Sequence, residues 1–119
     1  MPLDEIGPEI LDFVDRYIDQ FVAWDILAYF HENPDAKRKP SGIATDLGRK
    51  TAMVEPSLEI FVRKGILDRE PDEAGEPTYR YAAPAGFREN MDSFMTTMRD
   101  RTTRLAIVNL ILRKETRRF

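Results

Sequence analysis

The chain has 119 residues, of which 18 are Lys or Arg, 21 are Asp or Glu and 42 % are hydrophobic, a composition typical of one globular domain. It contains no cysteine and one histidine, His31, which excludes a disulfide scaffold, a thiol nucleophile and metal sites built from several histidines. No apolar run reaches the roughly 18 residues of a membrane span, and the N-terminal residues lack a signal-peptide pattern. We therefore expect a cytoplasmic protein without a membrane partner, a metal or a cofactor.

The charges are distributed unevenly along the chain. Residues 1–36 contain nine acidic residues and one basic residue, whereas residues 37–64 contain seven basic and three acidic residues. Residues 65–87 are again acidic, with five acids and two bases, and residues 88–119 are basic, with eight bases and four acids. Because the protein as a whole is acidic, a nucleic-acid interaction has to come from a local basic patch.

The first predicted element is an amphipathic helix between Glu9 and Phe30, where apolar residues recur at steps of three and four. The pattern is compatible with one long helix or with two helices separated near Asp19. It ends at Asn33 and Pro34, because a residue that precedes proline is driven out of the helical region.

The middle of the chain is predicted to form two short helices. Residues 34–40 are predicted to be a loop that carries a basic cluster. Ser41 is the predicted N-cap of the first helix, which stops at Gly48 in a left-handed conformation. Thr51 is the predicted N-cap of the second helix, which ends before Gly65.

Two strands and a long helix are predicted to follow. Residues 66–69 and 78–81 have the pattern of strands, and the turn-rich residues 71–77 join them into a hairpin. Residues 88–116 contain no proline or glycine and predict a single helix of roughly 43 Å, at 1.5 Å per residue. Such a helix would project beyond a domain of this size, so we expect a symmetric dimer through an apolar seam. The alternative is a bent helix that folds back onto its own domain. The predicted seam residues are Met91, Phe94, Met98, Leu105, Val108 and Leu112.

The order of helix, turn, helix and hairpin, together with the apolar spacing of residues 43–67, resembles the winged helix-turn-helix of small dimeric transcriptional regulators of bacteria. The residues that carry this resemblance are Ile43, Ala44, Leu47, Gly48, Val54, Leu58, Phe61, Gly65, Ile66 and Leu67. The resemblance implies a mainly α fold with a small β-hairpin. Residues 1–83 would form an N-terminal helix and the winged domain, whose core spans about residues 20–83, and residues 84–119 the dimerisation helix and a basic tail.

In such regulators the second helix of the motif enters the major groove and the wing contacts the flanking backbone. The resemblance therefore implies that residues 51–64 face double-stranded DNA and that residues 66–82 form the wing. The implied DNA-contacting residues are Lys37, Arg38, Lys39, Arg49, Lys50, Thr51, Glu55, Ser57, Arg63, Arg69 and Arg80.

A second interpretation keeps the same fold but replaces DNA with a protein partner. Glu55 and Glu59 place negative charge on the predicted groove-facing helix, and the wing tip carries Asp72, Glu73 and Glu76. A continuous positive surface on this side of the protein would favour DNA, and an interrupted one would favour a protein. We do not expect an enzyme, because the sequence has no glycine-rich phosphate loop, no histidine-anchored nucleophile and no cluster of metal ligands.

Overall fold

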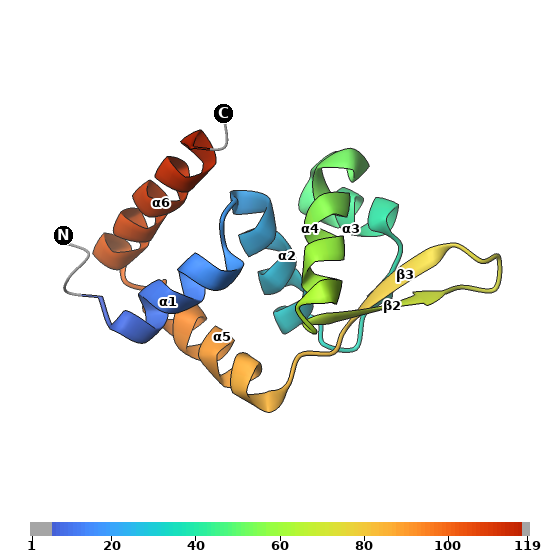
Figure 1. Ribbon diagram of the computed structural model, residues 1–119, viewed down its shortest axis with the longest axis horizontal. Coiled ribbons are helices and arrows are strands. Elements are labelled where there is room, and N and C mark those ends of the chain that lie inside the picture. The colour runs from blue at the N-terminus through green and yellow to red at the C-terminus, as the bar shows by residue number, and fades with distance from the viewer. Residues whose placement is uncertain (1–5, 118–119) are drawn as a thin grey trace.

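The structure is a computed structural model that describes residues 6–117, and in this range the chain forms six helices and a three-stranded sheet (Figure 1). The elements in chain order are α1 (Pro8–Tyr17), α2 (Phe21–Glu32), β1 (Lys37–Arg38), α3 (Pro40–Leu47), α4 (Thr51–Arg63), β2 (Leu67–Pro71), β3 (Pro77–Tyr81), α5 (Ala85–Thr97) and α6 (Arg101–Thr116). In the described part of the chain, no helix combines the length and the apolar character needed to cross a membrane.

The sheet is antiparallel, with β3 in the centre and β1 and β2 at its edges. The hairpin of β2 and β3 was predicted, but β1 was not, because residues 37–38 were expected to lie in a loop. This two-residue strand pairs Lys37 with Arg80 and Arg38 with Tyr79, so the sheet brings the basic cluster beside the wing. The mainly helical chain with this small sheet is compatible with a winged-helix-like fold.

The N-cap predictions were displaced by one or two residues, whereas the helix stop was confirmed. Lys39 and Lys50 occupy the N-cap positions of α3 and α4 in extended conformations, rather than Ser41 and Thr51. Neither N-cap side chain bonds the helix, so capping chemistry did not determine these starts. Gly48 does adopt the left-handed conformation, with φ of 67°, at the end of α3.

The N-terminal apolar pattern forms two helices rather than one. The chain turns at residues 18–20, where Ile18 is fully buried and Gln20 is the extended N-cap residue of α2. The amide N–H of Phe21 donates a hydrogen bond of 2.9 Å to the carboxylate of Glu115 in α6. The N-terminus of α2 is therefore capped by a residue 94 positions away in the sequence.

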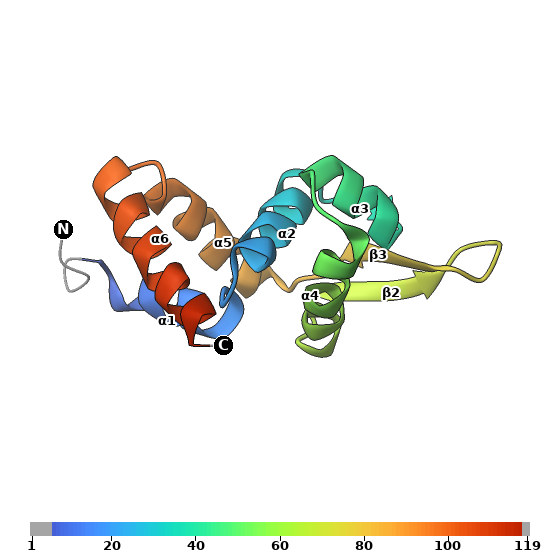
Figure 2. The same cartoon turned by 90° about the horizontal axis from the view of Figure 1, so that it is seen from above.

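The prediction of one long C-terminal helix was wrong, whereas the alternative of a bent helix that folds back onto its own domain was confirmed. Residues 85–116 form α5 and α6, which are separated at residues 98–100 and fold back against α1 (Figure 2). Asp100 begins α6 by accepting hydrogen bonds of 2.9 Å from the amide and 2.7 Å from the hydroxyl of Thr103. An Asp N-cap can start a new helix without a proline or glycine, which is why the absence of helix breakers was misleading.

The break divides the predicted dimer seam between the core and the surface. Met91 and Phe94 are fully buried and Met98 is 6 % exposed, within the core of their own chain. The ring of Phe94 lies 5.3 Å from that of Phe13 and 5.3 Å from that of Trp24. These three seam residues are therefore unavailable to a partner, and of the predicted set only Leu105, Val108 and Leu112 on α6 remain at least partly accessible.

We call α1, α5 and α6 the helical lobe and the elements from β1 to β3 the winged lobe; α2 lies between them (Figure 1). At the junction, His31 at the end of α2 contacts the hydroxyl of Tyr81 at 3.2 Å and the carboxylate of Asp92 at 2.6 Å. The guanidinium of Arg88 lies 4.5 Å from the ring centre of Tyr81. His31 thus joins a wing strand to α5.

Candidate nucleic-acid interface

A groove of about 580 Å³ lies between the beginning of α3 and the wing. Its basic wall is the consecutive segment Lys37–Lys39, which runs through β1 into the N-cap position of α3. The remaining lining residues are Ser41, Gly42, Pro71, Asp72, Glu73 and Thr78. The groove therefore combines the strongest run of basic residues with the start of a helix.

The start of α3 adds unpaired amide groups to this groove. The first N–H groups of a helix have no acceptor within the helix, and the helix dipole places partial positive charge at this end. In α3 these groups are the amides of Ser41 and Gly42, because Pro40 has no N–H and the amide of Ile43 already bonds the carbonyl of Lys39 at 3.0 Å. Amides and lysines together suit a phosphate oxygen.

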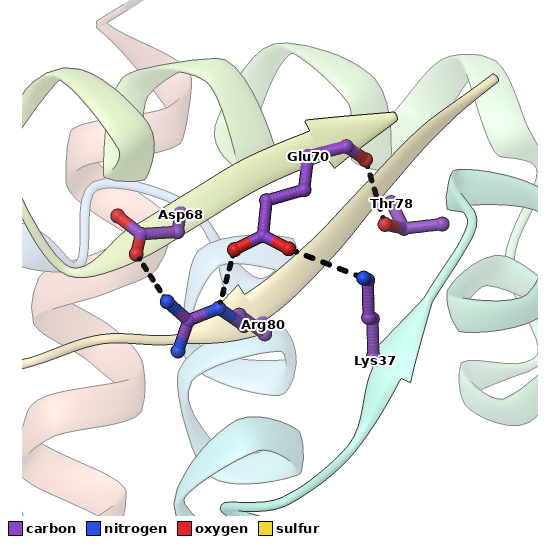
Figure 3. Close-up of polar contacts among 5 residues, drawn as sticks. All are labelled: Lys37, Asp68, Glu70, Thr78 and Arg80. Carbon is purple, nitrogen blue, oxygen red and sulfur yellow. Dashed lines mark hydrogen bonds and ion pairs between the residues drawn. The ribbon is translucent and has the colours of Figure 1, made fainter. Parts of the chain in front are cut away.

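An ion-pair network occupies the outer face of the sheet (Figure 3). The carboxylate of Glu70 lies 3.1 Å from Nζ of Lys37 and 2.9 Å from Nε of Arg80, and Arg80 also pairs with Asp68 at 2.8 Å. Hydrogen bonds lower the pKa of Glu70; the bond from Arg80 has the largest effect and the bond from Lys37 the next largest. Two of the predicted phosphate contacts therefore share one carboxylate partner.

Lys39 is paired in the same way with acids at the base of the wing turn. Its ammonium lies 2.7 Å from Glu76 and 3.2 Å from Asp72. The hydrogen bond from Lys39 to Glu76 is the main reason why the pKa of Lys39 is raised. Asp72 is ordered by accepting the amide N–H groups of Ala74 and Glu76 at 2.9 Å each, and the latter bond is the main cause that lowers its pKa.

Two further predicted contacts are held by acids outside the wing. Arg38 donates a hydrogen bond of 3.0 Å to Asp46, which also accepts the hydroxyl of Tyr29 at 2.7 Å. Arg49 pairs with Asp25 of α2 at 2.7 Å. These arginines therefore tie α3 and the following turn to neighbouring elements.

The outer face of α4 is less basic than a DNA-reading helix usually is. Glu59 accepts a hydrogen bond of 2.8 Å from Arg69 and one of 2.5 Å from the hydroxyl of Tyr79. The bond from Tyr79 is the main cause that lowers the pKa of Glu59, whereas burial is the main cause that raises the pKa of Tyr79 to about 12. Met53 and Glu55 are exposed on this helix.

The remaining predicted contacts differ in accessibility. Lys50 is exposed and makes no ion pair with any residue between 6 and 117, and Arg63 is exposed near the end of α4. Thr51 is half-buried at the N-terminus of α4. Ser57 was predicted to contact DNA, but it is only 4 % exposed because it lies on the side of α4 that faces α1 and α2. It does not belong to this surface.

The Glu59 contacts predict an acid-dependent loss of stability. A carboxylate whose pKa is lowered by folding stabilises the protein above its unfolded pKa of 4.5 and loses that contribution as the pH falls through the folded value. When the pH is lowered from about 6 to about 3, we therefore expect the melting temperature of the Glu59→Gln variant to fall by less than that of the wild type. The matched control is Glu55→Gln, on the same helix, because Glu55 makes no ion pair with any described residue. Equal acid sensitivity of the two variants would contradict the assignment.

No protein-family model and no curated protein matches the sequence. Among solved structures, the chain is similar to a protein described as a "Possible transcriptional regulator from Methanosarcina mazei Go1". The two share 14 % identity with a TM-score of 0.44, and the match covers 86 % of this chain and 78 % of that chain. The function therefore has to be inferred from the residues of this chain.

Proposed function

We propose that the protein is a winged-helix transcriptional regulator that binds double-stranded DNA, without catalytic activity, and that the groove between α3 and the wing holds the phosphate backbone. The observation that carries the proposal is the placement of Lys37–Lys39 beside the amides of Ser41 and Gly42, which have no acceptor among residues 6–117, in one open groove. Phosphate contacts of this kind position a protein on DNA without reading the sequence.

The ion pairs in the groove do not prevent phosphate binding. Lys37 and Lys39 have side chains 47 % and 46 % exposed, and ion pairs at such exposed positions contribute little to stability. A phosphate group that also receives helix amides can replace such a carboxylate. Because the displaced carboxylates remain nearby, we expect weak binding that depends strongly on salt.

Few residues of α4 are suited to recognise the base sequence of DNA. Thr51 at its N-terminus can contact a phosphate or a thymine methyl group, and the exposed Glu55 can accept a hydrogen bond from cytosine N4. No described residue of α4 is an Asn or a Gln, and its one arginine, Arg63, is at the C-terminal end. Most of the affinity should therefore come from contacts with the phosphate backbone of DNA rather than with its bases.

The direct test removes the accessible lysines. We expect the Lys37→Gln/Lys39→Gln variant, which changes the two lysines of the groove, to bind duplex at about 50 mM salt at least tenfold more weakly than the wild type, with a salt slope flatter by about 1.8, because each lost phosphate contact removes roughly 0.9. The control Arg99→Gln/Arg117→Gln removes equal charge from exposed positions of the helical lobe that lie outside the groove. If both variants bound DNA as the wild type does, the groove would not be the phosphate site.

We further propose a homodimer through α6. Leu105 and Leu112, seven residues apart on one helix face, are 52 % and 47 % exposed, and Val108 lies half-buried between them. Exposed Arg101, Arg104 and Arg113 surround this stripe, whereas α1 exposes Glu9, Asp12 and Asp15. A two-fold axis would bring the basic helix of each copy to the acidic helix of the other. Two winged lobes would then contact two half-sites about one helical turn apart.

Charge placed in the stripe should dissociate this dimer. We expect Leu105→Glu/Leu112→Glu to raise the dissociation constant in sedimentation at least about a hundredfold, because moving a carboxylate from water into an apolar interface costs several kcal/mol. Met53→Glu is the matched control, because Met53 is equally exposed, at 54 %, but lies on α4. Unchanged dimerisation in the double variant, or a monomeric wild type, would rule out α6 as the interface.

A protein partner is the second candidate, and the surface of α4 favours it. The exposed positions of this helix include the apolar residues Ala52, Met53 and Pro56 beside the acidic Glu55. Such a face, with Glu59 at its edge, fits a partner that carries basic and apolar residues. Under this interpretation the ion pairs of the wing would remain intact, and the lysine variants would leave the affinity for the protein partner unchanged.

A further inference from the structure

Gly42 lies in the first turn of α3, on helical backbone that does not require a glycine. Its φ is not in the left-handed region, which among the described glycines is adopted by Gly48, Gly65 and Gly75. Within a helix, alanine is more stable than glycine, because glycine loses more conformational freedom on folding. The backbone of α3 therefore gives no reason for a glycine at position 42.

The side chain of Arg38 occupies the space that a larger residue at position 42 would need. A Cβ atom built on Gly42 would lie 3.0 Å from Cζ and 3.0 Å from Nη2 of Arg38, which is closer than such atoms normally approach. Nη2 also donates a hydrogen bond of 3.2 Å to the main-chain carbonyl of Gly42 and one of 3.0 Å to the carboxylate of Asp46. The guanidinium therefore lies directly against the start of α3.

Folding stability does not explain this position of the guanidinium. The dipole of a helix favours anions at its N-terminus and cations at its C-terminus, and the first turn of α3 contains no acidic residue. Nε of Arg38 is buried without a hydrogen-bond partner in the part of the chain that the structure describes, which costs further free energy. Unfavourable local arrangements of this kind are expected mainly at functional sites.

We propose that Gly42 is a positioning residue for DNA. Because it has no side chain, the guanidinium of Arg38 stays beside the amides of Ser41 and Gly42, where one phosphate group can contact them together. The inference rests on the proposed function, since Arg38 and Gly42 both line the groove. A guanidinium carries five N–H donors and the two bonds described above use only Nη2, so donors remain for a phosphate oxygen. A methyl group at position 42 would push the guanidinium away from the helix amides.

A double-mutant cycle in duplex binding at about 50 mM salt tests whether Gly42 acts through Arg38. We expect Gly42→Ala and Arg38→Gln each to weaken binding about tenfold, because each loses one contact between a charged donor and a phosphate. Each should also flatten the salt slope by about 0.9. The Gly42→Ala/Arg38→Gln variant should bind as tightly as Arg38→Gln alone, since without the guanidinium the methyl group has nothing to displace.

Gly86→Ala is the matched control. Gly86 lies in the first turn of α5, and a Cβ atom there would meet no atom within 4 Å. Both alanine variants should melt at or above the temperature of the wild type, because alanine favours a helix more than glycine does. Only Gly42→Ala should bind duplex more weakly, so the change in affinity is separated from the change in stability.

Three results would overturn the inference and leave the proposed function intact. They are duplex binding by Gly42→Ala as tight as that of the wild type, additive losses in the double variant, and a melting temperature of Gly42→Ala well below that of the wild type. Additive losses would mean that the methyl group acts independently of Arg38, and a low melting temperature that Gly42 serves folding. A wild type that does not bind duplex would instead overturn the proposed function and this inference together.

Discussion

Glu70→Gln is expected to raise the affinity for duplex DNA by about five- to tenfold at about 50 mM salt. The variant removes the carboxylate shared by Lys37 and Arg80 and releases Lys37 towards phosphate, whereas Arg80 keeps its pair with Asp68 (Figure 3). A released cation that contacts a phosphate should steepen the salt dependence by roughly 0.9. Titration of labelled duplex at several salt concentrations measures the affinity and the slope together.

Glu73→Gln is the matched control for this experiment. Glu73 lines the same groove, is exposed, and makes no ion pair within the described part of the chain. It loses the same formal charge without releasing a cation, so its gain should stay within about twofold. An equal gain in both variants would mean that overall charge alone controls binding. A loss of affinity in Glu70→Gln would mean that the network positions the wing.

Phe94→Ala is expected to lower the free energy of unfolding by about 3–5 kcal/mol, which is the usual cost of truncating a buried phenylalanine. Phe94 is fully buried and its ring contacts Phe13 of α1 and Trp24 of α2. The loss should be independent of protein concentration, since the partners of Phe94 belong to its own chain. Urea unfolding at two protein concentrations measures the effect.

The control for Phe94→Ala is Leu105→Ala on α6. Leu105 is 52 % exposed, so this truncation should change the unfolding free energy of the folded chain by less than about 1 kcal/mol, apart from its effect on association. A concentration-dependent loss in Phe94→Ala would place its ring in the dimer interface after all. That result would contradict the fold of the helical lobe described above.

Local chain chemistry was enough to predict the order of elements in the winged lobe. Gly48 ends α3 as expected because its left-handed conformation suits glycine, and the β2–β3 hairpin follows from alternating residues around a turn-rich segment. The strand at Lys37 and Arg38 could not be predicted in this way. Two residues carry no detectable period, and the strand exists because β3 is available to pair with it.

The errors in the helical lobe arose from contacts between distant residues. Steps of seven residues place Met91 and Leu105 on one face only if the helix is continuous, and the cap formed by Asp100 interrupts it. The spacing of Asp100 and Thr103 is a local signal that could have revealed this break. The contact between Glu115 and the amide of Phe21 has no such signal, because it joins residues 94 positions apart.

The candidate site was predicted in part. The sequence predicted the basic cluster and the wing, but not that Lys37, Lys39, Arg69 and Arg80 would each be paired with an acid, because these pairs depend on strand register and on the position of the hairpin turn. Ser57 was assigned to the wrong side of α4. Ser57 lies three residues after Val54 and four residues before Phe61, which are both buried. This spacing is that of one helix face and could have placed Ser57 on the buried side of α4.

We propose that phosphate groups of DNA bind the groove beside α3. The most direct measurement is the affinity of the wild-type protein for a random-sequence duplex at about 50 mM and about 200 mM salt. With about four phosphate contacts, the affinity should fall at least about a hundredfold over this range through counterion release. An affinity that does not change with salt, or no binding at the lower concentration, would contradict the claim and favour a protein partner on α4.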